Sequence, residues 1–478
     1  MAGMLRNQND LIALRCRLTF TKKAWAVGSE LWEGSHQISE EVFTPLAELG
    51  ISLDKAKDDY QSPHFTLNYT QIGTQLQEAG NIASIGDANT PIWLQLSRNA
   101  QALSAFPWEV LSREITNRAL LRIPNFLIDP FTPPLVPRIA ICASVPMAKA
   151  IYNVGDYLNM TLEAIDPILK DTSFTSKVTL FLDEPTARYA NQEGRFKSMP
   201  HIDIAVADPA EAEKHGTAAK TYGNISSAKD TIRNPWLLWI LDHFEHQSVD
   251  SIHFISPSYF SGDSGALAFA PSPLVNNDRE WSRFIGAQEL SDFCDRLHCN
   301  AMLFSSASSA YWRIGHRLLV NELSWLRPGP IIHFDESSDS REALKSIYAA
   351  IYGRAPFVAD HDYTVQSSLH PDIIKRGFED GSEERSVDVD EYIRSHAGKL
   401  SVNSQRLKGN KVLLESLMKH ESSEVKTPTA LPQHMKILAQ KRAKLSQRTL
   451  KSPQQLEVDK GRMKALDFLS QLPKRGEF

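Results

Sequence analysis

One histidine and two adjacent serines lie in apolar runs that could bring them together. His253 belongs to the run SIHFIS, and Ser305 and Ser306 end the run AMLFSS. A serine hydroxyl becomes a nucleophile only when a neighbouring base takes its proton, and imidazole is the side chain that titrates near neutral pH. The pattern therefore raises the hypothesis of a serine hydrolase with His253 as its base. The position of His253 in the middle of its run, three residues after Asp250, fits a packed ring as well.

Cysteine offers a second nucleophile. Cys294 and Cys299 lie near His298, and a thiolate beside an imidazole is a reactive pair. Both thiols, however, precede the run at 301–306, whereas a strand-end nucleophile would follow it. The four cysteines of the chain form no CxxC pair, zinc spacing or disulfide framework. We therefore expect reduced thiols with structural roles.

The segment SGDSGAL at 261–267 resembles the motif that contains the catalytic serine of trypsin-like proteases. Those enzymes also require a histidine and an aspartate upstream in characteristic surroundings, and neither is visible here. Gly262 and Asp263 are turn-forming residue types. We predict a turn between two strands at this point.

His243 and His246 are three residues apart and share one face of a predicted helix. A catalytic zinc site needs three protein ligands, and the sequence offers no third. A histidine at the end of a helix also interacts favourably with the helix dipole. Because Walker A and dinucleotide fingerprints are missing too, we expect neither a metal nor a cofactor.

Strand-like runs alternate with amphipathic helices from about residue 85 onward. The predicted strands cover 92–96, 138–144, 177–182, 201–207, 251–256, 300–306 and 330–335. The predicted helices begin after Asn234, an N-cap residue type placed before Pro235, and cover 287–298 and 340–353. This alternation predicts an α/β domain with a mostly parallel sheet.

Composition divides the chain into four parts. Residues 1–84 contain short alternating runs that predict a small β-containing unit, and residues 85–355 form the α/β domain. Residues 356–410 are polar and in part acidic, which is typical of a linker. Residues 411–478 carry 14 Lys and Arg against 7 Asp and Glu, and we expect a basic, helical or partly disordered tail.

The bulk composition excludes several classes of protein. With 42% hydrophobic and 23% charged residues, the 478-residue chain is ordinary for a globular protein. No run approaches the roughly 20 apolar residues of a membrane helix, and residues 1–17 lack the features of an export signal. We expect a cytoplasmic protein without membrane contact. The basic tail lacks the aromatic residues of nucleic-acid-binding modules, so a protein partner is favoured over nucleic acid.

The run PWEVL at 107–111 resembles the PWELL element of CHAT domains, which are cysteine peptidase relatives of caspases and separase. The passage at 126–144 is similar to that family's entry into its first main strand, and 251–269 lies where its histidine strand is expected. Residues 285–293 and 327–353 resemble the segment before the nucleophile strand and the closing strand and helix. The resemblance spans about 85–355. It implies a caspase-like three-layer α/β/α sandwich.

The family's catalytic histidine and cysteine both have different residues in this chain. The resemblance implies a His-Gly pair at the end of one strand, where this sequence has Pro257 and Ser258. It implies a cysteine at the end of the neighbouring strand, where this sequence has Ser306. Proline has neither a titratable group nor a backbone N–H, and a serine hydroxyl is a much weaker nucleophile than a thiolate.

The resemblance therefore implies a catalytically degenerate pseudo-peptidase that acts as a protein-binding or regulatory scaffold. CHAT proteins are frequent in bacterial defence and programmed-death systems, which implies such a setting here. Ser258, Ser305 and Ser306 could line a retained peptide groove, because ground-state binding does not depend on contacts made only in the transition state. The alternative is an active serine or cysteine hydrolase that uses Ser306 with an unconventional base such as His253.

Overall fold

The computed structural model divides the chain into two compact units, Met1–Ser404 and Gln405–Phe478. All residues that the structure describes belong to the first unit. They are 11–21, 24–33, 36–51, 65–85, 90–124, 136–144, 154–169, 176–192, 196, 199–215, 231–245, 247–274, 283–306, 310–327, 329–335, 340–352 and 365–368. The predicted tail at 411–478 and most of the predicted linker lie outside these residues.

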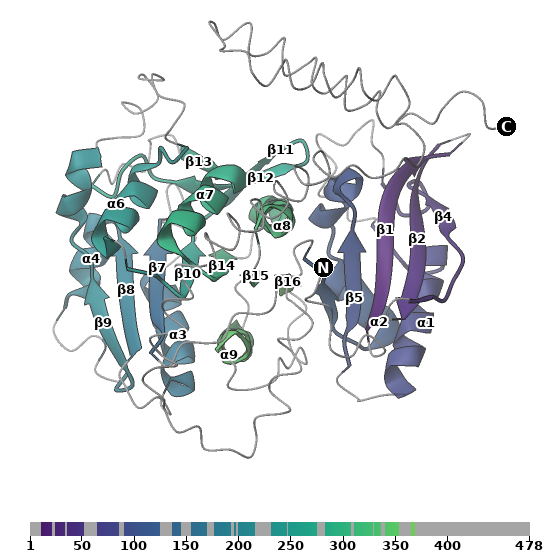
Figure 1. Ribbon diagram of the computed structural model, residues 1–478, viewed down its shortest axis with the longest axis horizontal. Coiled ribbons are helices and arrows are strands. Elements are labelled where there is room, and N and C mark those ends of the chain that lie inside the picture. The colour runs from purple at the N-terminus through teal and green to yellow at the C-terminus, as the bar shows by residue number, and fades with distance from the viewer. Residues whose placement is uncertain are drawn as a thin grey trace, which may run out of the picture. The chain divides into compact units, whose positions relative to one another are not determined.

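A large mixed sheet runs through the unit, and six neighbouring parallel strands form the part that matters most here (Figure 1). In sheet order they are β15 (Ile331–Asp335), β14 (Ala301–Ser306), β10 (Ser251–Ile255), β7 (Arg138–Ala143), β8 (Ser176–Leu182) and β9 (Ile202–Val206). Most of these strands are nearly continuous apolar runs, as expected of a parallel sheet that is covered on both faces. The predicted α/β fold with a largely parallel sheet is confirmed.

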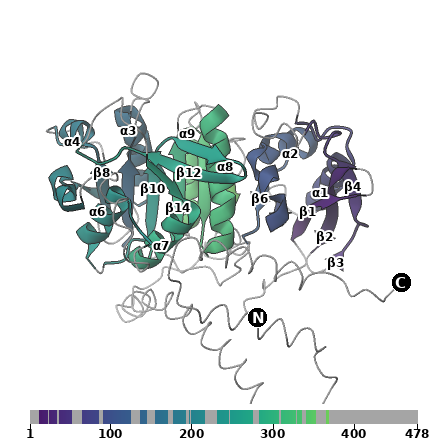
Figure 2. The same ribbon diagram turned by 90° about the horizontal axis from the view of Figure 1, so that it is seen from above.

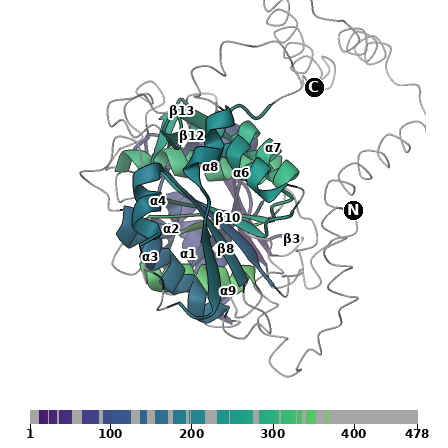
Figure 3. The same ribbon diagram turned by 90° about the vertical axis from the view of Figure 1, so that its left-hand side faces the viewer.

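Helices pack against both faces of these strands (Figures 1 and 3). One face is covered by α3 (Val154–Ile165) and α9 (Ser340–Ile351). The other is covered by α6 (Pro235–Phe244), α7 (Ala287–Leu297) and α8 (Ala310–Leu326). Successive strand residues alternate between the two cores, so Phe254 packs with α7 while Ile255 packs toward α9. Shorter helical segments are α4 (Glu184–Ala190), η4 (Asp166–Ile168) and η5 (Pro209–His215).

The start of α6 confirms a local prediction. The side-chain oxygen of Asn234 accepts a hydrogen bond of 2.9 Å from the backbone N–H of Trp236, and Pro235 occupies the first helical position. Such a cap satisfies one of the N–H groups that a helix start leaves unpaired. Trp236 and Trp239 then bury their rings in the core below.

The N-terminal strands belong to the same sheet. The hairpin of β1 (Ile12–Phe20) and β2 (Trp25–Glu33) pairs on one side with β3 (His36–Gln37) and β4 (Val42–Pro45). On the other side β1 pairs in parallel with β5 (Ile92–Leu96), which pairs with β6 (Leu120–Arg122). These strands pack with α1 (Gln71–Ile85) and α2 (Trp108–Thr116) around one hydrophobic core, whose residues come from between Ile12 and Leu120 in the sequence. This core crosses the boundary predicted after residue 84, because β5 and α2 pack with the N-terminal strands.

The predicted linker at 356–410 contains a strand that sequence reasoning missed. β16 (Gln366–Ser368) pairs antiparallel with β15, and its last residue pairs with Arg122 of β6. All three of its residues are buried. This part of the linker prediction is therefore wrong: a buried strand joins the two parallel parts of the sheet here.

A second, small antiparallel sheet follows β10. It consists of β11 (Ser258–Ser261), β12 (Ser264–Phe269) and β13 (Arg283–Gly286). Gly262 and Asp263 form the two-residue loop between the first two strands, with φ +63° at Gly262, so the predicted turn is confirmed. This hairpin lies against α8 (Figure 2), and a Cβ atom on Gly265 would collide with the carbonyl oxygen of Gly315.

Candidate functional site

The parallel pairing of β10 and β14 brings His253 to Ser305. His253 is opposite Leu303 in the register, and Ser305 lies two residues further along on the same face. The Nε2 atom of His253 is 2.9 Å from the Oγ of Ser305. Its other ring nitrogen, Nδ1, is 3.1 Å from the hydroxyl of Tyr348 on α9. Of the two serines at the end of β14, it is Ser305 that the structure places against His253.

This histidine is closed off from solvent. Both His253 and Ser305 have an exposed fraction of 0%. Burial lowers the pKa of His253 to about 3, because the charged imidazolium would lose its hydration. A neutral imidazole has one N–H donor and one acceptor nitrogen, and the two hydroxyls can satisfy both. The contacts therefore describe a neutral core histidine.

Two tyrosines extend the buried polar contacts, Tyr348 on α9 and Tyr352, the residue that follows this helix. The hydroxyl of Tyr352 lies 2.6 Å from the Oγ of Ser251, and its ring stacks on that of Tyr348 at an interplanar angle of 11°. Burial raises the pKa of both phenols. All of these groups are neutral hydroxyls or a neutral ring at physiological pH, so they hold α9 against the sheet without burying a charge. The sequence offered only a weak signal for them, a pair of tyrosines four residues apart on an apolar helix face.

The two positions at which the resemblance implies catalytic residues end adjacent strands. Pro257 follows β10, is buried, and accepts a hydrogen bond of 2.9 Å from the backbone N–H of Ala268. Ser306 is the last residue of β14 and is opposite Asp335 in the register with β15. The structure thus places Pro257 and Ser306 at the carboxyl ends of neighbouring parallel strands, where open α/β sheets commonly carry their sites.

Two of the three predicted groove residues do not line a groove. Ser258 is 2% exposed, and it packs against Gly315 of α8. Ser305 is fully buried against His253. The close approach of the hairpin to α8 covers the first, and α9 covers the second. The side chain of Ser306, the third, lies outside the described residues.

The cysteine alternative has no support in the geometry. Cys294 and Cys299 are free and buried, and the thiol of Cys299 donates to the carbonyl oxygen of Ala301 at 3.1 Å. Burial raises the pKa of Cys299, which keeps its thiol protonated. Burial acts in the same direction on Cys294, but a hydrogen bond from Cys299 and the charge of Arg327 outweigh it and lower the pKa of Cys294. His298 is the left-handed residue that ends α7, and its Nδ1 is buried without a hydrogen-bond partner among the described residues. The Nδ1 atom is therefore not bonded to either thiol.

His243 takes part in local contacts near the end of α6. Its Nδ1 lies 3.6 Å from a carboxylate oxygen of Glu211, and its ring packs edge-on against Phe181. His246 lies outside the described residues. Across the part of the chain that the structure describes, no three histidine, cysteine or acidic side chains come together as metal ligands.

The PWEVL segment has a structural role that the sequence did not reveal. Glu109 of α2 accepts hydrogen bonds from Arg122 Nε at 2.8 Å and from Arg317 Nη1 at 3.2 Å. All three side chains are at most 5% exposed. Arg317 also donates to the carbonyl oxygen of Phe106 at 2.8 Å. Because Arg317 is on α8, the helix that follows β14, this motif ties the N-terminal core to the helix beside Ser306.

A comparison with models of protein families finds no match to this chain, and a comparison with curated proteins finds no significant relative. Within the described residues, no helix combines the length and the apolar character that crossing a membrane requires.

Proposed function

We propose that the chain is a CHAT-like protein with a caspase-like sandwich, that it has lost peptidase chemistry, and that it acts by binding a protein partner as a scaffold or regulator. A bacterial defence or signalling system is the setting that the resemblance implies. Support comes from the order of elements in the sequence and from the parallel neighbours β10 and β14. These strands end beside the two positions at which the family would carry its histidine and its cysteine.

Two features together carry the proposal. Pro257 stands at the position of the base, and both ring nitrogens of His253 already have hydrogen-bond partners. A peptidase of this kind needs an imidazole at the strand end that can take the nucleophile's proton. Pro257 has no such group, and the nearest upstream histidine, His253, is buried with both ring nitrogens engaged. Its position in the core cannot be exchanged for one in a cleft without breaking both contacts.

The 2.9 Å contact between His253 and Ser305 favours a second candidate, a serine hydrolase. A general base must become an imidazolium during the reaction. Burial lowers the pKa of His253 from 6.5 to about 3, which corresponds to a penalty on the order of 5 kcal/mol for that charged form. A substrate would also have to displace α9 to reach Ser305. The binding function is therefore the better supported of the two.

A labelling experiment separates these candidates. The full chain is treated with a fluorophosphonate, which reacts with activated serines, and is assayed for hydrolysis of a mixed peptide library. The proposal expects neither labelling nor turnover above that of the Ser305→Ala and Ser306→Ala variants. Turnover in the wild type that either substitution abolishes would establish a hydrolase instead.

An exposed aromatic pair offers a surface for the partner. The rings of Tyr259 and Phe284 stack at 4.5 Å on the small sheet, and they are 38% and 47% exposed. Aromatic residues are enriched in protein interfaces. A partner that co-purifies with the wild-type chain from its native cells is expected to be lost from a Tyr259→Ser/Phe284→Ser double variant. It should be retained by the matched control Phe20→Ser/Trp25→Ser, which changes another exposed aromatic pair.

A further inference from the structure

A hollow of about 370 Å³ lies over the N-terminal strands, far in sequence from β10 and β14. It is lined by residues of β1, β2 and β5, by two residues that follow β5 and by the residue before β4: Arg15, Cys16, Arg17, Gly28, Glu30, Gln95, Leu96, Ser97, Arg98 and Glu41. Alternation along β1 puts Arg15 and Arg17 on the face opposite to the core that α1 and α2 cover. Arg98 lies two residues beyond the end of β5, and the carboxyl ends of parallel strands are where α/β sheets commonly bind ligands.

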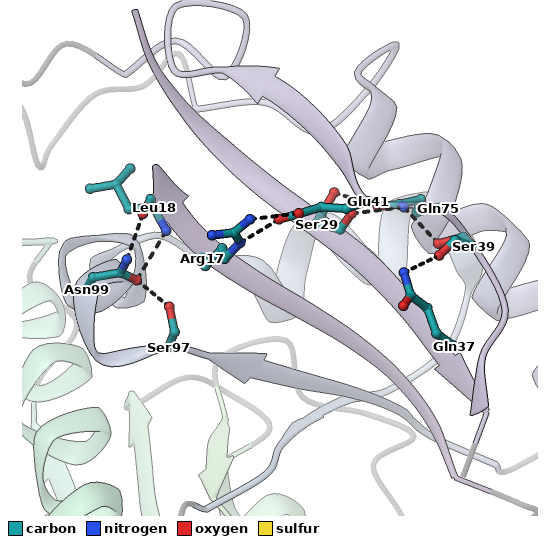
Figure 4. A network of polar contacts seen from close by, with 9 residues as sticks. All are labelled: Arg17, Leu18, Ser29, Gln37, Ser39, Glu41, Gln75, Ser97 and Asn99. Atoms are coloured by element: carbon teal, nitrogen blue, oxygen red, sulfur yellow. Dashed lines mark hydrogen bonds and ion pairs between the residues drawn. The ribbon is translucent and has the colours of Figure 1, made fainter. Parts of the chain in front are cut away.

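One arginine of the hollow is already neutralised. Arg17 binds Glu41 through two parallel contacts, Nε to Oε1 at 2.5 Å and Nη2 to Oε2 at 2.7 Å (Figure 4). This pairing raises the pKa of Arg17 and lowers that of Glu41. Gly28 makes the room for it, since a Cβ atom there would collide with the carboxylate of Glu41.

The remaining charges leave the hollow positive. Outside the Arg17–Glu41 pair, Arg15 and Arg98 carry two positive charges and Glu30 carries one negative charge, which gives a balance of +1. Arg98 is exposed and begins the segment η3 (Arg98–Ala105). A positive cavity of this size is within the range of small-molecule sites, which starts at about 300 Å³.

Arg15 is held in place before any ligand arrives. Its guanidinium lies 3.9 Å from the centre of the Trp32 ring, which fixes its plane. Its Nε is buried and has no hydrogen-bond partner among the described residues. Desolvation by burial lowers the pKa of Arg15, so this cation has lost part of its hydration. The charge of Glu30, which is opposite Arg15 in the β1–β2 register, acts in the other direction but does not cancel the effect of burial. An incoming oxyanion would restore that loss through charge-assisted hydrogen bonds.

We propose that this hollow is a binding site for a small oxyanion ligand, a molecule that carries a phosphate or carboxylate group, with Arg15 and Arg98 as its two cationic contacts. Arg17 is paired with Glu41 and lines the hollow without being free to bind the ligand. The amide of Gln95, opposite Arg15 in the β1–β5 register, adds a polar group to the lining. This site is independent of the proposed pseudo-peptidase function, because none of its residues belongs to the strands β10 or β14.

The test is calorimetric titration of the full chain with inorganic phosphate in one arm and with malonate in the other. We expect saturable binding of one equivalent in at least one arm. Saturation by phosphate alone would identify a phosphorylated ligand, and saturation by malonate alone would identify a carboxylate ligand. Saturation by both would show that the site recognises the oxyanion group that the two probes share. Failure of both probes to bind at about 10 mM, a concentration that reveals even millimolar affinity, overturns the proposal.

Substitutions locate the binding. Arg98→Gln and Arg15→Gln are each expected to weaken binding at least about tenfold. Each removes one charge-assisted contact, and a tenfold loss corresponds to about 1.5 kcal/mol. The matched control is Arg188→Gln on α4, which removes an exposed arginine that pairs with Glu184 elsewhere on the surface. Because Arg98 is exposed, its variant folds even if the Arg15 variant does not. Equal affinities in the wild type, Arg98→Gln and Arg188→Gln would show that the hollow is not the site.

Discussion

The imidazole of His253 and the hydroxyl of Ser305 are 2.9 Å apart, at hydrogen-bonding distance, in a place with no exposed surface. In a cleft, the same two groups would be a nucleophile and its base. Here α9 closes the site with Tyr348, which bonds to the other nitrogen of the ring. Whether such a pair is catalytic or structural thus depends on whether solvent and substrate can reach it. A structural role for this pair has consequences for the stability of the fold.

Removal of one partner of this contact should destabilise the fold. Ser305→Ala leaves a ring nitrogen of His253 buried without a partner, and such a loss costs about 1–3 kcal/mol in the free energy of unfolding. Urea denaturation followed by far-UV circular dichroism measures it. Ser84→Ala is the matched control, because Ser84 is exposed and should cost less than about 0.5 kcal/mol. Equal midpoints for the two variants would contradict a structural role for Ser305.

The depressed pKa of His253 predicts a pH dependence of stability. The folded-state pKa is about 3 and the unfolded value is 6.5, so below pH 6.5 the unfolded state binds a proton that the folded state does not. Stability therefore falls as the pH falls from about 6.5 toward 3. Between pH 7.5 and 5.0 this residue alone should remove about 2 kcal/mol. His253→Gln, compared with the wild type by urea denaturation at both pH values, should lose that much less on acidification. A parallel loss in both proteins would show that His253 is not the residue responsible.

The features that could be predicted from the sequence are those that depend on residues close together in the chain. The apolar runs at 251–256 and 300–306 became adjacent strands, and Asn234 capped its helix, because strand patterning and helix caps depend on neighbours in the chain. Which serine meets His253 depends instead on strand register, since a shift of one residue reverses the face. The register places Ser305 there.

What the sequence could not provide are contacts made across long separations. The strand at 366–368 is three polar residues long, too short and too polar for a periodic pattern, and it forms only because β6 and β15 offer edges to it. Tyr348 lies 95 residues from His253 in the chain, and Arg317 lies 208 residues from Glu109. The PWEVL motif was visible, but its electrostatic partners were not.

Glu109 should be among the most sensitive positions of the N-terminal core. Glu109→Gln removes the carboxylate that two buried guanidinium groups share, and breaking a buried ion pair in this way costs about 3–5 kcal/mol. Glu184→Gln is the matched control, because it breaks an exposed pair with Arg188 that is worth less than about 1 kcal/mol. Differential scanning calorimetry of both variants measures the two effects. Similar melting temperatures would mean that the buried cluster contributes no more than a surface pair.

The approach of the small sheet to α8 depends on a glycine pair, and this gives a steric prediction. Gly265→Ala places a methyl group against the carbonyl oxygen of Gly315, a backbone atom that cannot rotate away. Overpacking of this kind costs about 1–3 kcal/mol. Gly286→Ala, at the end of β13, is the matched control, because a Cβ atom there meets open space and only the N-cap of α7 changes, for less than about 1 kcal/mol. Urea midpoints should therefore fall further for Gly265→Ala. If the control lowers the midpoint as much, the hairpin has room to move away from α8, and the cover over Ser258 is looser than the structure shows.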